Sequence, residues 1–599
     1  MERSRVTVEY RHLHQQIFEH EAEGVHCVVQ NISGGVPESL TLAQALDAVD
    51  TRLSDWHGPM EGFTQPVTDY ADGYRLVVPQ VIEWDLWPRL YVCDRCSIVY
   101  RTDDSTELRR YCVVPACRGT HRQLPYFRVH RCGKRQQLYV PRCRVDSDHP
   151  MRFHDAGSFI TAYFSCSVCN SRYDIFSGRC DCSLTGLSTQ ERQYRLVKAR
   201  DSKAFYPHHV TVVNISAVLS RARSANRGPL WAMAHYLGTV KDLTGLVDEA
   251  TGRQSGAEAD DAMQRMLSFL DTTPGLTDEQ REEFTDVLNA TRGEEPGLSE
   301  AESLLDAETI QEARRDRRIF ERGFIFHERD PESLGEISQR YRDAGHHGMA
   351  ARMDTGNQSA LNLGFSRIAV IRKLPIALIA FGFTREFSDH RAQLKPLQPP
   401  ERDRAARRPL VTIESNTEAV FFELDARLLW RWCHANGWTT DPDPVNDRDA
   451  RAWVARHTFV AERSDVSLAI QRLTHAWAHT LIHSLEGRSA FGPNSVAEYL
   501  MERTGSFFIY VANYSTFNLG GLTTLVEQRL ADWLSAAVEQ TTCVHDPVCL
   551  NERGGCHKCL ALAFHCERFN RGLHRGYLIG SEDPQVDVGW IFHAASAHR

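Results

Sequence analysis

The sequence predicts an α+β multi-domain protein with N-terminal zinc-ribbon modules, a helical middle region and a C-terminal α/β domain that carries a cysteine-rich zinc site. Three observations support this prediction. The chain has 599 residues, more than one hydrophobic core usually organises. Its 17 cysteines concentrate in two clusters, ten within residues 91–182 and five within residues 543–566. Short apolar runs of strand character alternate with longer amphipathic stretches of helical character.

The composition is that of a globular protein, with 42% apolar and 25% charged residues. The N-terminus lacks the apolar core of a secretory signal. The most apolar stretch, "IAVIRKLPIALIAFGF", is interrupted by Arg372 and Lys373, so it predicts a buried strand and not a membrane span. We therefore expect a cytoplasmic protein without membrane contact, in which reduced thiols bind metal in preference to forming disulfides. The net charge of −9 argues against general coating of nucleic acid but permits a local basic groove.

Changes in composition divide the chain into five regions. The 191–360 stretch is polar and charged, and capping boxes at Thr277/Gln280 and Ser299/Glu302 predict helix starts there. Near the C-terminus, a long helix is expected to begin at a Ser464/Asp465 cap. The expected regions are 1–90 (α+β), 91–190 (zinc ribbons with two zinc sites), 191–360 (mostly helical), 361–463 (β-rich) and 464–599 (a zinc-binding α/β domain).

The first zinc site is predicted from two cysteine hooks. Cys93 and Cys96 form a C-x-x-C knuckle, and Cys112 and Cys117 follow in a slightly wider hook. Two hooks at this separation place four thiolates around one tetrahedral zinc ion, as in zinc ribbons.

A second zinc site is predicted from the next two hooks. We expect Cys166 and Cys169 to share one ion with Cys180 and Cys182. Cys132 and Cys143 lie between the sites, near His130, His149 and His154. These two cysteines could replace the C-x-C pair as ligands, form a third site or be buried thiols, and we favour the last alternative.

The third cysteine cluster predicts a closed structural site. Cys556 and Cys559 form its clearest hook, and Gly554 and Gly555 allow a tight backbone turn beside it. All-thiolate sites are usually structural, and no thioredoxin-like context supports a redox pair. We thus expect two to three structural Zn²⁺ ions in the chain. The other ligands of this site are expected among Cys543, Cys549 and Cys566.

Three histidines share one face of the expected C-terminal helix. His475, His479 and His483 are spaced four residues apart, which permits metal binding. The metalloprotease pattern requires a glutamate after the first histidine, and none is present. Because the helix is apolar on most sides, buried core histidines are the favoured interpretation, with a metal or phosphate contact as the alternative.

Motifs for common enzyme chemistry are missing from the sequence. There is no G-x-x-x-x-G-K-[ST] loop, no G-x-S-x-G elbow and no dinucleotide-binding fingerprint. We therefore predict a non-enzymatic protein without a small-molecule substrate, whose zinc modules form interfaces with nucleic acid or protein.

Several C-terminal motifs, taken in order, resemble a known cysteine-rich domain. They are "HAWAHTLIHSL", "SVAEYL", "FFIYVAN…LGGLTTL" and "C…DPVC…GCHKCL…HCERFNRGLHR". This succession is similar to the domain that ends superfamily 2 DNA helicases of the MrfA type. The same domain occurs in DrmB, the helicase-associated subunit of the DISARM anti-phage system. "LPIALIAFGFTREF" and "NTEAVFFELDARLLWRW" resemble DrmB alone. By order, the helicase ligands map onto Cys543, Cys549, Cys556 and Cys559, while Cys566 matches a further cysteine of DrmB-like proteins.

The resemblance implies a non-catalytic accessory subunit that pairs with a DrmA-like superfamily 2 helicase and engages DNA with it. Basic side chains would contact phosphates while the partner hydrolyses ATP. The alternatives are a zinc-dependent hydrolase or nuclease that uses the three histidines, and a pure protein–protein scaffold. Candidate DNA contacts are Arg385, Arg402, Arg404, Arg407 and Arg408, together with the run Arg314, Arg315, Arg317 and Arg318.

Overall fold

The computed structural model describes most of the chain, and none of the helices in this part has both the length and the apolar character needed to cross a bilayer. The expected cap at Thr277, as well as Arg402 and Arg404, lies outside the described residues. The described residues are 12–20, 24–102, 110–114, 116–155, 161–215, 217–223, 227–251, 296–399, 407–489, 491, 495–512, 519–562, 566–582 and 584–597.

The protein is a mixed α+β structure that divides into two compact units, each built from two chain segments. The N-terminal unit comprises Met1–Val212 and Ala377–Ser415. The C-terminal unit comprises Val213–Ile376 and Asn416–Arg599. Two long strands, β15 (Phe365–Thr384) and β17 (Arg408–Leu424), continue from one unit into the other.

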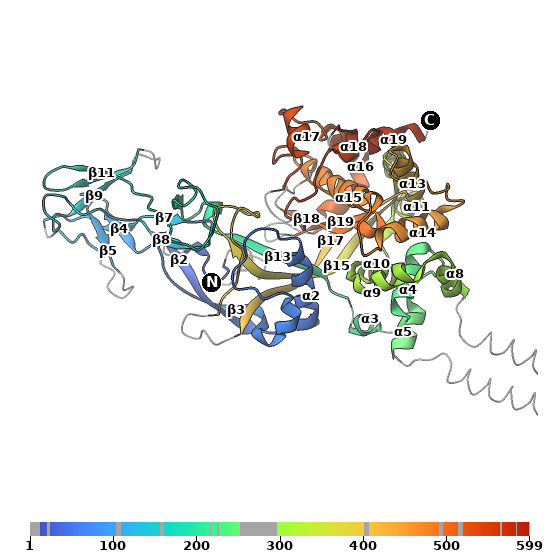
Figure 1. Ribbon diagram of the computed structural model, residues 1–599, viewed down its shortest axis with the longest axis horizontal. Coiled ribbons are helices and arrows are strands. Elements are labelled where there is room, and N and C mark those ends of the chain that lie inside the picture. The colour runs from blue at the N-terminus through green and yellow to red at the C-terminus, as the bar shows by residue number, and fades with distance from the viewer. Residues whose placement is uncertain are drawn as a thin grey trace, which may run out of the picture. The chain divides into compact units, whose positions relative to one another are not determined.

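The N-terminal unit is dominated by β-structure (Figure 1). Its main sheet has the strand order β1-β2-β3-β17-β15-β13, in which β17 runs parallel to β3. Three small sheets of three strands each follow the orders β5-β4-β6, β12-β7-β8 and β11-β10-β9. The elements are β1 (Ile17–His20), β2 (Val25–Gly35), α2 (Leu42–Ser54), η1 (Val67–Gly73), β3 (Tyr74–Leu86), β4 (Leu90–Cys93), β5 (Val99–Arg101), β6 (His121–Gln123), β7 (Tyr126–Val129), β8 (Arg135–Gln137), β9 (Met151–His154), β10 (Tyr163–Cys166), β11 (Arg172–Asp174), β12 (Arg195–Lys198), η3 (Ser202–Ala204), β13 (Tyr206–Val213) and β16 (Lys395–Pro396).

The C-terminal unit combines helices with strands β14, β18 and β19 and with its portions of β15 and β17 (Figure 1). Its elements are α3 (Ala217–Ala222), α4 (Gly228–Leu237), α5 (Thr244–Thr251), α8 (Pro296–Leu304), α9 (Ala307–Arg315), α10 (Arg317–Glu328), β14 (Glu332–Ser333), α11 (Leu334–Asp343), α12 (His347–Asn362), α13 (Ala426–Ala435), α14 (Asp447–Thr458), α15 (Asp465–His483), β18 (Val496–Met501), η5 (Glu502–Thr504), β19 (Ser506–Val511), α16 (Gly521–Glu539), α17 (Val548–Arg553), α18 (Gly576–Ile579) and α19 (Trp590–Ala597).

The sheet of the C-terminal unit is buried on both faces. Strand β19 pairs antiparallel with both β17 and β18. Because side chains alternate along a strand, Val420 and Phe422 face one core while Phe421 faces the other. Helices α15 and α16 contribute to the first core, and α4 and α10 contribute to the second. This arrangement points alternate residues of β18 toward α15.

Helix α15 begins at the residues that the sequence predicted as its cap. Ser464 is the N-cap of α15, and its hydroxyl accepts a hydrogen bond from the backbone N–H of Ser467 at 3.1 Å. The helix ends at His483, shortly before Gly487, whose φ is +74°. The prediction of a cap at Ser299 is wrong, because α8 already begins at Pro296 and places this serine inside the helix.

Candidate metal centres

Within the described part of the chain, four groups of cysteine and histidine side chains bring their sulfur and nitrogen atoms together. Within each group the four ligand atoms all lie within 4.8 Å of one another. The closest sulfur pairs are 3.5–3.8 Å apart. A disulfide would require about 2.05 Å, whereas thiolates on a tetrahedral zinc ion lie about 3.8 Å apart. The spacing therefore suits a shared metal ion and not disulfide bonds.

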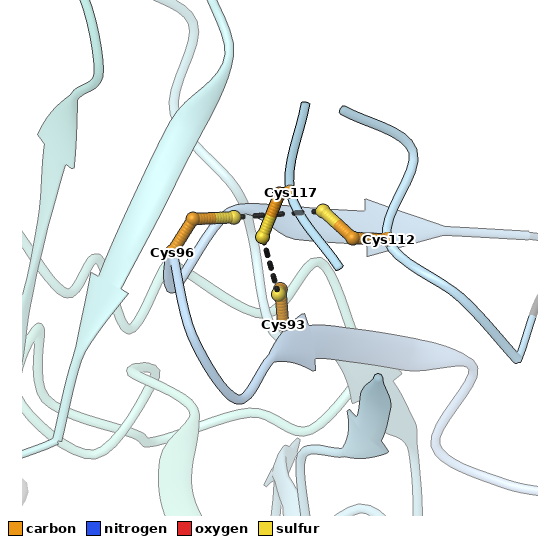
Figure 2. Close-up of side chains that lie close together, drawn as sticks. All are labelled: Cys93, Cys96, Cys112 and Cys117. Carbon is orange, nitrogen blue, oxygen red and sulfur yellow. Dashed lines mark hydrogen bonds between the residues drawn. The ribbon is translucent and has the colours of Figure 1, made fainter. Parts of the chain in front are cut away.

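The first group is the predicted quartet Cys93, Cys96, Cys112 and Cys117, and Figure 2 shows the four side chains converging. Cys93 ends β4, and Cys96 follows in the turn before β5. Cys93 Sγ lies 3.6 Å from Cys117 Sγ, and Cys96 Sγ lies 3.5 Å from Cys112 Sγ (Figure 2). The four residues that the spacing of the hooks grouped in the sequence therefore also lie together in space.

Two further features allow the two hooks of this group to lie close together. Asp94 accepts hydrogen bonds from the backbone N–H and the hydroxyl of Thr120, each at 2.8 Å. A Cβ at Gly119 would stand 2.5 Å from Cys93 Sγ, so only glycine fits beside this sulfur.

The thiols of this group differ in acidity. Burial opposes ionisation of Cys93, but hydrogen bonds from the backbone N–H groups of Cys96 and Arg95 outweigh it and help to lower its pKa to about 7. Burial raises the pKa of Cys96 to about 12. Four adjacent thiolates repel one another, and a divalent cation is what would hold all four in the ionised form.

The second group consists of Cys143, His149, Cys166 and Cys169. Cys166 ends β10, and its sulfur lies 3.5 Å from Nδ1 of His149. The Cys143 and Cys169 sulfurs are also 3.5 Å apart. The Cys166/Cys169 knuckle has the same backbone turn as the Cys93/Cys96 knuckle. In both, the residue after the second cysteine has a positive φ, +59° at Ser97 and +58° at Asn170.

The third group consists of His130, Cys132, Cys180 and Cys182. The sulfur of Cys132 lies 3.7 Å from that of Cys180, and the sulfur of Cys182 lies 3.7 Å from Nδ1 of His130. The other ring nitrogen of His130, Nε2, lies 3.0 Å from the carbonyl oxygen of Glu191. If Nε2 donates to this carbonyl, Nδ1 carries a lone pair that a metal could bind, a common arrangement in metal sites. The backbone N–H of Cys132 donates to the same lone pair at 3.3 Å.

The predicted second zinc site is therefore grouped differently in the structure. Cys166 and Cys169 do not meet Cys180 and Cys182, since each pair completes a different group. Cys132 and Cys143 are buried, as favoured from the sequence, and each also lies in one group together with a histidine. Each of the three small sheets of the N-terminal unit thus carries one group at its strand ends.

The fourth group, in the C-terminal unit, is Cys543, Cys549, Cys556 and Cys559. The closest sulfur pairs, Cys543 with Cys556 and Cys549 with Cys559, are each 3.8 Å apart. Gly554 has a φ of +67°, as the expected tight turn requires. Cys566 is not part of this group.

A buried arginine that no sequence pattern indicated braces the fourth group. The guanidinium of Arg575 donates to the carbonyl oxygen of Thr541 at 2.6 Å and to both carboxylate oxygens of Asp546 at 2.5 and 2.9 Å. Its backbone N–H donates to Gly554 at 2.9 Å. Arg575 is fully buried, and although it is the last residue of the "HCERFNRGLHR" motif, nothing in the sequence indicated such a role.

Two of the three histidines of α15 lie together in one buried set, and the third lies outside it. His475 and His479 are buried, as expected, and they lie beside Glu498 and Cys566. His483 lies outside this set, with Nε2 3.3 Å from the carbonyl oxygen of Ala561. Glu498 belongs to the "SVAEYL" motif, but nothing in the sequence indicated that its carboxylate faces α15.

The arginines proposed to contact DNA separate into buried and accessible residues. Arg385 is fully buried, so its prediction as a phosphate contact is wrong for this structure. Arg317 and Arg318 form ion pairs with Glu321 and Glu567, each at 2.9 Å. Arg407 is exposed. The partly exposed Arg408 lies 5.9 Å from the ring centre of Tyr74, and the exposed Arg314 and Arg315 end α9.

Residues 8–212 match the family model of a domain of unknown function, DUF8724. The DUF8724 region contains the first three cysteine groups and ends at Val212, where the first segment of the N-terminal unit also ends. None of the curated proteins matches the chain. The three small sheets with their metal-ligand groups are thus a property of the DUF8724 region of this chain.

Proposed function

We propose that this chain is a non-catalytic, zinc-stabilised accessory subunit that partners a superfamily 2 helicase and helps it to bind DNA in an anti-phage defence system. The observation that carries the proposal is the composition of the fourth group. The four cysteines that lie together, Cys543, Cys549, Cys556 and Cys559, are those onto which the ligands of the MrfA-type helicase domain map by order. Agreement between the sequence mapping and the spatial grouping supports the resemblance on which the helicase partnership rests.

The ligand sets favour structural over catalytic zinc. Each of the four groups supplies four cysteine or histidine donors, and two consist of cysteine alone. A zinc ion with four protein ligands is closed, whereas catalytic zinc keeps one position for water or substrate. The three groups of the N-terminal unit would serve as zinc ribbons that stiffen small sheets with too few apolar residues to be stable alone, and the fourth would hold together the segments on either side of α17.

The DNA contact is proposed for the first cysteine module and for the accessible arginines near β17. Arg95, Arg110, Arg118 and Arg122 are all exposed and all belong to residues 95–122 around the first group. The exposed ring of Tyr111 lies in the same segment. Arginines and an aromatic ring on a rigid module are suited to bind phosphates and to stack on bases. Arg407 and Arg408 remain proposed contacts, whereas burial removes Arg385 from the proposal.

The partnership is tested by purifying the tagged chain from its native host and identifying the proteins that accompany it by mass spectrometry. We expect a superfamily 2 helicase in nearly equal amount. A chain that purifies alone, with no helicase at any salt concentration, would contradict the partnership.

The DNA contact is tested on the purified complex by measuring affinity as a function of salt. Replacing Arg118 and Arg122 by serine should weaken binding and reduce the slope of log affinity against log salt by about 0.7–0.9 for each phosphate that is no longer neutralised. The control replaces the exposed Arg352 and Arg529 of the C-terminal unit and should leave the slope unchanged. If the wild-type complex binds no DNA at low salt, the chain acts as a protein scaffold and the DNA part of the proposal is wrong.

A further inference from the structure

We propose that His475, His479, Glu498 and Cys566 form a fifth metal site, which takes one zinc-type divalent cation and is distinct from the four cysteine-rich groups. The ligand atoms of these four residues all lie within 4.8 Å of one another. The inference does not depend on a helicase partner or on DNA binding.

Three separate elements aim the four side chains at one point. His475 and His479 stand one turn apart on α15. Glu498 lies in β18 between Val496 and Leu500, which face the core that α15 also helps to form, so the carboxylate points the same way. Cys566 lies on the segment that follows the fourth group in the sequence. All four side chains are at least 94% buried, with exposed fractions of 1%, 0%, 0% and 6% in sequence order.

The distances suit a common ion. Nε2 of His475 lies 3.1 Å from Nε2 of His479 and 3.3 Å from Sγ of Cys566. The carboxylate of Glu498 completes the set, with Oε1 at 3.3 Å from Nε2 of His475 and Oε2 at 2.8 Å from Nε2 of His479. Nitrogen and oxygen ligands about 2.0–2.1 Å from a tetrahedral zinc ion are roughly 3.3 Å from each other.

Hydrogen bonds alone satisfy these atoms poorly. Nε2 of His475 is surrounded by three atoms that carry lone pairs, on His479, Glu498 and Cys566, and a single ring proton can serve only one of them. Unmet polar atoms in a buried position are costly. A divalent cation at the centre accepts lone pairs from all four residues at once, and it offsets the charges of one carboxylate and one thiolate.

The surrounding backbone orients the ligand atoms as in known metal sites. Nδ1 of His479 lies 2.8 Å from the carbonyl oxygen of Leu560, so a proton on Nδ1 leaves the lone pair of Nε2 directed at the centre. The sulfur of Cys566 accepts hydrogen bonds from the backbone N–H groups of Asn570 at 3.0 Å and Arg568 at 3.4 Å, which stabilise a thiolate.

The carboxylate is held in the same manner. Oε1 of Glu498 accepts a hydrogen bond from the backbone N–H of Glu567 at 3.0 Å. Backbone donors thus fix both anionic ligands before any ion binds.

The ligand set defines the kind of site. Two imidazoles, one carboxylate and one thiolate suit zinc and related borderline ions better than magnesium or calcium, which prefer oxygen alone. Four buried protein ligands leave no accessible position for a substrate, so the ion would be structural. The ion would connect α15 and β18 with the segment that follows the fourth group. A separate site of this kind also explains why Cys566 is not part of the fourth group.

The test counts zinc per full-length chain by mass spectrometry of purified protein expressed with added zinc. His479→Gln and Cys566→Ser should each lose one zinc equivalent relative to the wild type. The matched control His483→Gln changes a histidine one turn farther along α15 that is not part of the set, and it should lose none. Unchanged zinc content in both H479Q and C566S would overturn the proposal.

A double substitution separates the new site from its neighbour. Cys559→Ser removes a ligand of the fourth group, so combining it with Cys566→Ser should cost two zinc equivalents if the sites are independent. A loss of only one would mean that Cys566 shares the ion of the cysteine quartet, which contradicts the proposal.

The wild-type protein provides a test if these variants fail to fold. Crystals of the full chain measured at the zinc absorption edge should show an anomalous peak bonded to His475, His479, Glu498 and Cys566. If a peak appears at the cysteine quartet but not here, the four residues form only a metal-free cluster, and the proposal fails.

Discussion

The side chain of Arg385 donates a hydrogen bond from Nε to the carbonyl oxygen of Gly133 at 3.0 Å. Gly133 directly follows Cys132, so the Gly-Phe-Thr-Arg motif braces the loop that carries the third cysteine group. The other guanidinium nitrogens donate to the carbonyl oxygens of Ala204 and, at 3.2 Å, of Gln15. The guanidinium also lies 5.1 Å from the ring centre of Phe383. Arg385 therefore joins three segments of the N-terminal unit and is fully enclosed.

We predict that Arg385→Gln destabilises the N-terminal unit and does not act as the removal of a DNA contact. The shorter amide cannot reach all three carbonyl oxygens, and leaving buried acceptors unpaired should lower the free energy of unfolding by about 3 kcal/mol. Thermal and urea denaturation of the full chain would measure the change.

The control for this variant is Arg407→Gln, an exposed arginine close in sequence. It should leave the unfolding midpoint unchanged. If R385Q unfolds like the wild type but binds DNA more weakly, the structural role assigned to Arg385 is wrong.

Local cysteine patterns predicted the hooks and the partners within the first group, but not the partners of Cys166/Cys169 and Cys180/Cys182. A C-x-x-C pair fixes two ligands because the intervening turn is short, as at Cys93/Cys96 and Cys166/Cys169. The partner of a hook depends on which strands pair, and this is decided by non-local contacts. Cys143 and His149 reach Cys166 because β9 pairs with β10, which a spacing rule cannot reveal.

We predict that zinc content will follow the spatial groups and not the order of cysteines along the chain. Cys132→Ser and Cys180→Ser should each remove one zinc equivalent, and the double variant should also remove only one, since both belong to the third group. The combination of Cys166→Ser with Cys180→Ser should remove two. A loss of one from this second combination would restore the grouping expected from sequence.

We predict that Gly119→Ala weakens the first cysteine group. The added Cβ would stand 2.5 Å from Cys93 Sγ and 2.6 Å from Oδ1 of Asp94, so the hooks must separate. Overpacking of this kind costs about 1–3 kcal/mol, and zinc should be released to a chelator more readily. Gly73→Ala is the matched control in the same unit, because a Cβ there meets nothing within 4 Å. Equal zinc release from both variants would contradict the prediction.

The C-terminal unit shows what sequence periodicity can and cannot supply. The Ser464 cap located the start of α15, and its apolar pattern correctly predicted that His475 and His479 are buried. The pattern could not show that Glu498 faces α15, because an isolated glutamate in an apolar strand resembles a solvent-exposed position. It also could not identify Arg575, whose role depends on the loop at Thr541 and Asp546, distant in sequence.

We predict that Arg575 and Asp546 are strongly coupled in the stability of the C-terminal unit. Arg575 is fully buried and makes two hydrogen bonds to this carboxylate, so removing either partner leaves the other without its ionic partner beside the cysteine quartet. A double-mutant cycle with Arg575→Met and Asp546→Asn, followed by urea denaturation, should give a coupling energy of about 2 kcal/mol. The more exposed pair Arg391 and Asp389 is the control, and its coupling should stay below about 1 kcal/mol. Coupling no larger than in the control would mean that Arg575 does not brace the loop through Asp546.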